Sequence, residues 1–183
     1  MDLTIELLAL LGMVAVIAGF IDAIAGGGGL LTIPALLFTD ITPVQAIATN
    51  KLQACFGSFT ATRFFVKQKL VIPKQQKAAI IVTSIGAILG AIAIQLFDSD
   101  VLISILPFAL ILIAIYLILA KNFGQPADKP KLNTTTFNLS FIPSIGFYDG
   151  FFGPGTGTFF TLSYCKMQAL DLIQATAHAK LMN

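Results

Sequence analysis

Long apolar runs restrict the fold of this chain of 183 residues more than any other feature. They extend over roughly 20 residues each, the length that an α-helix needs to cross the hydrocarbon core of a bilayer. Charged residues make up only 11% of the sequence, whereas a soluble domain carries about 25%. So few charges cannot cover a surface that faces water, so the sequence predicts an all-α, polytopic helical membrane protein.

One segment of the sequence occurs twice. Each copy begins with Gly-Phe-x-Asp, continues into a glycine cluster and ends with Gln-Ala-x-Ala-x-x-Lys-Leu. The first copy extends from Gly19 to Leu52, and the second extends from Gly146 to Leu181. Apolar segments with charges at matching places are typical of transporters built from internal repeats. The sequence therefore predicts two homologous membrane repeats.

The first repeat covers residues 1–120. Its first apolar stretch is expected to break at 26–29, because consecutive glycines disfavour a helix, and to continue as a short helix over 30–38. The expected longer helices are 3–25, 44–65, 78–97 and 101–120.

A polar linker covers 121–136, and the pattern starts again at 137. The second repeat, 137–183, breaks at 153–157 and holds fewer apolar segments than the first. We expect this second repeat to be incomplete and the chain to be a truncated form.

Basic residues predict the orientation in the membrane. They gather at 63–77 and in the linker, and the expected loops at 40 and at 98–100 contain none. The positive-inside rule therefore predicts that the basic loops, and with them the N-terminus, are cytoplasmic. Four crossings are expected between the two copies, which predicts parallel repeats.

The glycine clusters have two interpretations. Gly26 and Gly28, with Gly153 and Gly155 in the second copy, form either flexible kinks or broken helices whose backbone amides bind an anion. A single glycine run would favour the kink, but recurrence of the clusters at matching places gives the two interpretations equal weight.

Charged residues flank both breaks. Asp22 and Asp149 precede them, and each carboxylate either caps the break, carries a coupled proton or cation, or pairs with a lysine as a gate. Lys51 and Lys180 follow the breaks and are the predicted positive site for an anionic substrate, although a lysine near a helix end also reaches towards the membrane surface. The predicted hydrogen-bonding partners of the anion are Thr49, Asn50, Gln174 and Thr176. His178 either contacts the substrate or carries a proton, or it is a hydrogen-bonded packing residue.

Other kinds of site find no support. Cys55 and Cys165 lack metal-binding spacing, no nucleophile–base set is visible, and a net charge of +2 is too small to indicate nucleic-acid binding. The sequence thus predicts a protein that is not an enzyme, with no cofactor and no metal. Its predicted partners are a small anion and the lipid bilayer, and homo-oligomer formation is left open.

The doubled motif resembles the TauE/SafE family, also called the sulfite exporter family, and most of all its YfcA-like branch. The resemblance is carried by GFIDAIAGGGGLLTIPAL with ATNKLQA, and by GFYDGFFGPGTG with ATAHAKLMN. It implies a multi-pass protein of the bacterial inner membrane with seven to eight crossings in two repeats. It also implies proton-driven export of small anions such as sulfite or organosulfonates. A passive anion channel and a non-transporting membrane scaffold are the alternatives.

Overall fold

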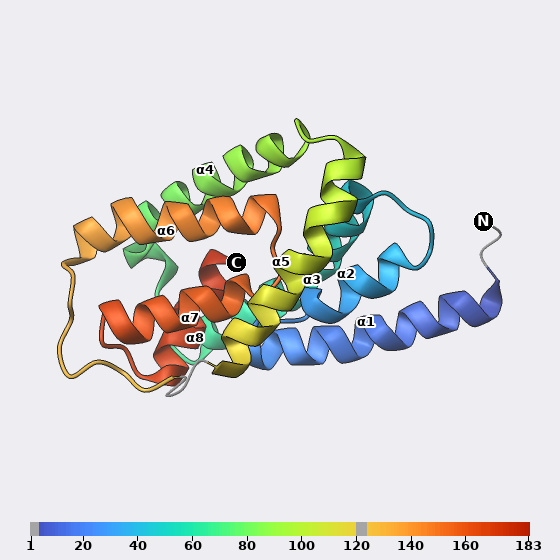
Figure 1. Cartoon of the computed structure of the whole chain (residues 1–183). Helices are drawn as coiled ribbons and strands as arrows, with labels where there is room; N and C mark the ends of the chain where they lie inside the picture. Colours follow the sequence, from blue (N-terminus) through green and yellow to red (C-terminus); the bar gives the residue numbers. More distant parts are fainter. Residues whose placement is uncertain (1–3, 120–123) are drawn as a thin grey trace.

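The computed structural model describes residues 4–119 and 124–183, and all regular structure in these ranges is helical (Figure 1). One 3-10 turn, η1 (Pro73–Gln75), joins the third helix to the fourth. The α-helices of the described ranges are α1 (Ile5–Ala25), α2 (Gly29–Leu37), α3 (Pro43–Lys67), α4 (Lys77–Ile94), α5 (Ser99–Leu119), α6 (Thr134–Phe151), α7 (Thr156–Met167) and α8 (Leu172–Met182). The predicted all-α fold class is confirmed.

Side-chain caps fix the starts of several helices. Thr42 accepts a hydrogen bond from the backbone of Gln45, whose side chain in turn accepts from the backbone of Thr42, which is a capping box before Pro43. Asp171 caps α8 in a similar way. Within the described ranges, the predicted helix ends fall within a few residues of the observed ones. The predicted helix start at 3, the predicted helix end at 120 and residues 121–123 of the predicted linker lie outside these ranges. The sequence did not predict the turn that separates α7 from α8.

The glycine break after α1 reverses the chain. Gly26 ends α1 with φ of 79°, in the left-handed region that glycine tolerates, and its N–H donates to the carbonyl of Asp22. A Cβ atom built on Gly28 would lie 2.5 Å from the carbonyl oxygen of Ala18, so α2 packs back along α1 (Figure 1). The break therefore separates two helices, α1 and α2, that run in opposite directions (Figure 1).

The helices that end the two copies of the motif, α3 and α8, run antiparallel. Thr62 of α3 donates to the carbonyl of Lys180 at 2.7 Å, and Asn183 donates to Ser58 at 3.0 Å, so the numbering falls on one helix as it rises on the other. Helices α1 and α6, which begin the two copies, also run in opposite directions in Figure 1. The prediction of parallel repeats is therefore wrong for these helix pairs.

Glycines allow α4 and α6 to approach each other closely. A Cβ on Gly86 would lie 2.9 Å from the backbone nitrogen of Phe147, and one on Gly146 would lie 2.8 Å from the hydroxyl of Thr83. Gly90 and Gly150 lie in the same contact. Small residues of this kind are common between membrane helices, where close backbone packing replaces hydrophobic burial as the source of stability.

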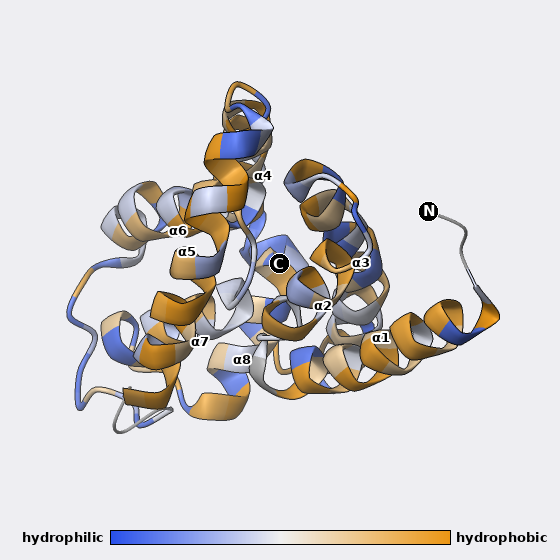
Figure 2. Ribbon diagram, turned by 45° about the vertical axis from the view of Figure 1, so that its right-hand side comes forward, coloured by the Kyte–Doolittle hydropathy of each residue, from blue (hydrophilic) through white to orange (hydrophobic). Residues whose placement is uncertain are grey.

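Three described helices, α1, α4 and α5, are long and apolar enough to cross a membrane. Exposed large apolar side chains on these helices include Val16, Ile88 and Ile118. Figure 2 shows the ribbons of these helices coloured largely as hydrophobic. These faces suit contact with lipid, which solvates them as well as a protein core does.

Candidate functional site

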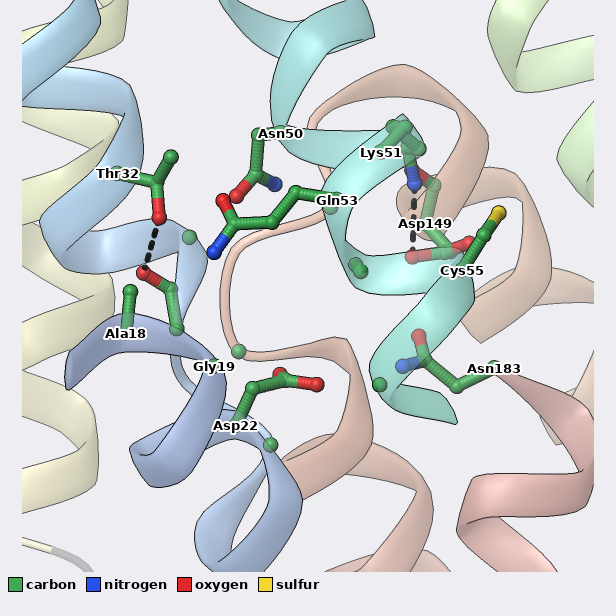
Figure 3. Close-up of a pocket in the computed structure, with 17 residues that line it drawn as sticks. Ala18, Gly19, Asp22, Thr32, Asn50, Lys51, Gln53, Cys55, Asp149 and Asn183 are labelled. Atoms are coloured by element: carbon green, nitrogen blue, oxygen red, sulfur yellow. Dashed lines mark hydrogen bonds and ion pairs between the residues drawn. The ribbon is translucent and has the colours of Figure 1, made fainter. Parts of the chain in front are cut away.

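Two ion pairs connect the two copies of the motif crosswise. The ammonium nitrogen of Lys51 lies 2.8 Å from a carboxylate oxygen of Asp149 (Figure 3), and that of Lys180 lies 3.2 Å from a carboxylate oxygen of Asp22. Each lysine therefore pairs with the aspartate of the other copy. The contacts are reciprocal, as expected when equivalent helices of two copies meet in opposite directions.

The end of a helix helps to hold each lysine. Asp22 and Asp149 lie four residues before Gly26 and Gly153, in the last turns of α1 and α6. Each lysine also donates to the main-chain carbonyl of its aspartate. The last carbonyls of a helix lack intrahelical partners and carry partial negative charge, so an ammonium group is favoured there.

The two pairs differ in burial. The side chains of Lys180 and Asp22 are 1% and 12% exposed, whereas those of Lys51 and Asp149 are 29% and 18% exposed. An unpaired charge in a low-dielectric interior is costly, so the ion pair is what makes a buried Lys180 tolerable. The less buried pair is the one whose lysine, Lys51, lines a polar cavity, whereas Lys180 does not.

A polar cavity of about 120 Å³ lies beside these pairs. Figure 3 shows its wall, in which the side chains converge from α1, α2, α3 and α6. Since one water takes up about 30 Å³ of the liquid, the cavity has room for a few waters or one small ion. Its polar and small-residue lining includes Asp22, Gly26, Gly28, Gly29, Thr32, Asn50, Lys51, Gln53, Asp149, Gly153, Gly155 and Asn183.

Asn50 is the buried polar side chain in this wall whose bonding capacity is unused. The residue is 7% exposed and lines the cavity, and none of the hydrogen bonds found within residues 4–119 and 124–183 involves its carboxamide. Its amide nitrogen would lie 3.0 Å from a Cβ built on Gly29, at the start of α2. No side chain caps that first turn of α2, so Asn50 and a helix N-terminus lie together at the cavity.

Glycine is needed at several points of the wall. A Cβ on Gly153 would lie 2.9 Å from the Lys51 ammonium nitrogen, and the residue has φ of 89°. The two breaks also touch, because a Cβ on Gly26 would lie 2.6 Å from the Cα of Gly157. A larger side chain at these positions would displace Lys51 or separate the two breaks.

The structure brings together most of the predicted site residues. Lys51, Asn50, both aspartates and the four predicted glycines line the cavity, and Lys180 joins it through Asp22. Lys51 and Lys180 are not free cations, however, since each is paired with a carboxylate. The carboxylates do not cap the breaks: it is the main-chain carbonyl of Asp22 that accepts the Gly26 N–H.

Two predicted residues lie away from the cavity. Thr49 is exposed, and His178 contacts the carbonyl of Gln174 at 2.8 Å and packs its ring 5.1 Å from that of Tyr164. Each lies two residues before its lysine, which is about 200° around a helix. Their place in the motif therefore does not put them on the lysine's face.

Sequence reasoning missed Thr32, Gln53 and Asn183, which complete the polar wall. Gln53 had a detectable signal, because Asn50, Gln53 and Gly57 recur at helical spacing and form one polar, small-residue stripe on α3. Among the described residues, no group of three His, Cys, Asp or Glu side chains is placed to hold a metal ion.

Apolar membrane-length helices, two glycine breaks and buried ion pairs between them define the class of polytopic membrane transport proteins. Comparison with known families agrees, since residues 11–183 match the family described as Sulfite exporter TauE/SafE. The chain belongs to this TauE/SafE family.

The curated relatives of this chain are also described as membrane transporter proteins. The chain is 46% identical over 182 residues to "Probable membrane transporter protein ORF9" of Sinorhizobium sp, covering 100% of this chain and 70% of the relative. It is 46% identical over 177 residues to "Probable membrane transporter protein YfcA" of Escherichia coli K12, covering 97% of this chain and 66% of the relative. The chain thus spans about two thirds of the length of these relatives. No solved structure matches it.

Proposed function

We propose that this protein moves small anions across the bacterial inner membrane, and that sulfite or organosulfonates are its substrates. The observation that carries the proposal is the pair of reciprocal Lys–Asp contacts beside a glycine-lined polar cavity, in a chain that is otherwise apolar. Ionisable groups inside a membrane are costly and mark ion pathways. The family description adds the outward direction, and the coupled ion proposed is the proton.

The cavity supports a small, anionic substrate. Lys51 supplies the positive charge, and the uncapped first turn of α2 faces the same space as the free carboxamide of Asn50. An oxyanion accepts hydrogen bonds from all three kinds of donor. The volume of about 120 Å³ suits an anion of a few heavy atoms.

The proposed topology follows from the reversal at Gly26. Residues 63–77, which include the turn at 68–76, and the linker together hold eight of the eleven basic residues, and both are proposed to be cytoplasmic. Because α2 runs back along α1, the N-terminal end of α1 is proposed to lie on the opposite side, with Asp40 and Ser99. The two copies are then inverted repeats, a common arrangement in secondary transporters.

Flux into vesicles tests the function. The protein is reconstituted in liposomes, and uptake of radiolabelled sulfite is measured with and without a pH gradient, with the Sinorhizobium relative assayed in parallel. We expect flux that responds to the gradient and disappears in Lys51→Ala, while Lys77→Ala, a change at the start of α4 outside the cavity lining, keeps it. Gradient-independent flux would instead indicate a channel. No flux in this protein beside an active relative would overturn the proposal.

A further inference from the structure

The two ion pairs are equivalent in sequence but not in access. Lys51 and Asp149 line the polar cavity and also an apolar groove of about 620 Å³ between α3 and α4. Lys180 lines neither space, and its side chain is 1% exposed. Only the Lys51–Asp149 pair is therefore reachable from two sides, and it is the pair that an entering anion can open.

Charge balance limits how an anion can bind there. An anion that takes the hydrogen bonds of the Lys51 ammonium group leaves the carboxylate of Asp149 beside it, so the site would hold two negative charges and one positive charge. Like charges at close range in a partly buried site disfavour each other and favour protonation of the carboxylate. Binding of one proton to that carboxylate removes the excess negative charge.

Asp149 is the acceptor of that proton, because none of the described groups around it offers an unpaired carboxylate. On α1, Asp22 is already neutralised by Lys180 of α8. On α6, the hydroxyl of Tyr148 donates to the carbonyl of Pro154 at 2.5 Å. Helix α4 presents Gln95 and apolar residues to the groove, and α3 adds Cys55 to the cavity.

We propose that Asp149 takes up one proton each time an anion binds to Lys51, so that a proton and an anion cross together, while the Lys180–Asp22 pair stays closed. This inference rests on the function proposed above and assigns its coupling residue. For a monoanion the transport step is then electroneutral, and export by this step needs an outward anion gradient larger than the inward proton gradient.

Proton counting in detergent solution tests the inference. The probe is methanesulfonate, a small monoanion that does not itself titrate between about pH 5 and 8, so any proton taken up binds to the protein. Binding is followed by protection of Cys55, which lines the cavity, against a maleimide, since Cys165 is buried. Proton uptake is read from a pH-indicator dye in weak buffer.

The expected result is about one proton per bound anion, with an apparent Kd that rises about tenfold for each unit of pH over the range in which the proton is taken up. Asp149→Asn should bind the anion with no proton uptake and no pH dependence. Lys51→Gln should not bind. Asp128→Asn, in the exposed linker, is the matched carboxylate control and should behave like the wild type.

Three outcomes would overturn the inference. The first is binding without proton uptake, and the second is proton uptake that persists in Asp149→Asn. The third is uptake that disappears in Asp22→Asn but not in Asp149→Asn, with circular dichroism confirming that both variants are folded. Anion flux would survive in these cases, and the proposed function with it. Absence of both binding and flux here and in the Sinorhizobium relative would overturn both proposals.

Discussion

Replacement of Asp22 by Asn should destabilise the protein far more than the same change at Asp149. The Lys180 side chain is 1% exposed and its ammonium group lies 3.2 Å from the Asp22 carboxylate, so the variant leaves a buried charge without a counter-ion. Removal of one member of a buried ion pair costs about 3–5 kcal/mol. The Lys51–Asp149 pair, with side chains 29% and 18% exposed, is partly solvated, and its loss should cost about 1 kcal/mol.

Unfolding in mixed micelles by SDS, followed by circular dichroism at the helix band, measures this difference; the chain has no tryptophan for a fluorescence signal. The control is the double variant Asp22→Leu with Lys180→Met, which removes both charges and should recover most of the stability lost by Asp22→Asn. Equal losses for Asp22→Asn and Asp149→Asn, or no recovery in the double variant, would refute the assignment of Lys180 as a buried paired charge.

Three further changes test the packing and the topology. Gly28→Leu should abolish anion flux, because its Cβ would meet the carbonyl of Ala18, whereas Gly12→Leu, which has nothing within 4 Å of its Cβ, should keep it. Gly150→Leu should force α4 and α6 apart and lower the free energy of unfolding by at least about 1–3 kcal/mol in the SDS assay; a stable variant would contradict the close packing. Impermeant thiol reagents in a cysteine-free background should label Cys at Ser99 and Thr4 from outside and Cys at Lys69 only after lysis, and outside labelling of Lys69 would contradict the proposed orientation.

Helix positions were predictable from the sequence because they depend on local signals. Apolar runs of membrane length, the glycines at the breaks and the Thr42-Pro43 start of α3 each act within a few residues. The direction of α2, in contrast, depends on a packing contact with another helix. A glycine in the left-handed conformation permits either a continued or a reversed chain, and the packing of Gly28 on Ala18 is what selects reversal.

The charged residues of the candidate site could be predicted from the sequence, but the pairing between them could not. The doubled motif identified Asp22, Asp149, Lys51 and Lys180, since charges in apolar repeats are costly. Which aspartate meets which lysine depends on the relative direction of the two copies, and that direction depends on the reversal at Gly26. The predicted four crossings between the copies do not include this reversal. The sequence therefore predicted parallel copies and left open which aspartate pairs with which lysine.

The pairing changes what the lysines can do. An unpaired lysine at the centre of a membrane helix costs about 3 kcal/mol on insertion scales, and a neighbouring carboxylate lowers that cost by forming a neutral pair. The same carboxylate then competes with any anion for the ammonium group. In the buried pair of Lys180 and Asp22 that competition favours the protein, because Lys180 lines neither the polar cavity nor the apolar groove and its side chain is 1% exposed. At Lys51 the cavity gives an anion access, so the contact that stabilises the lysine in the membrane also makes anion binding depend on protonation of Asp149.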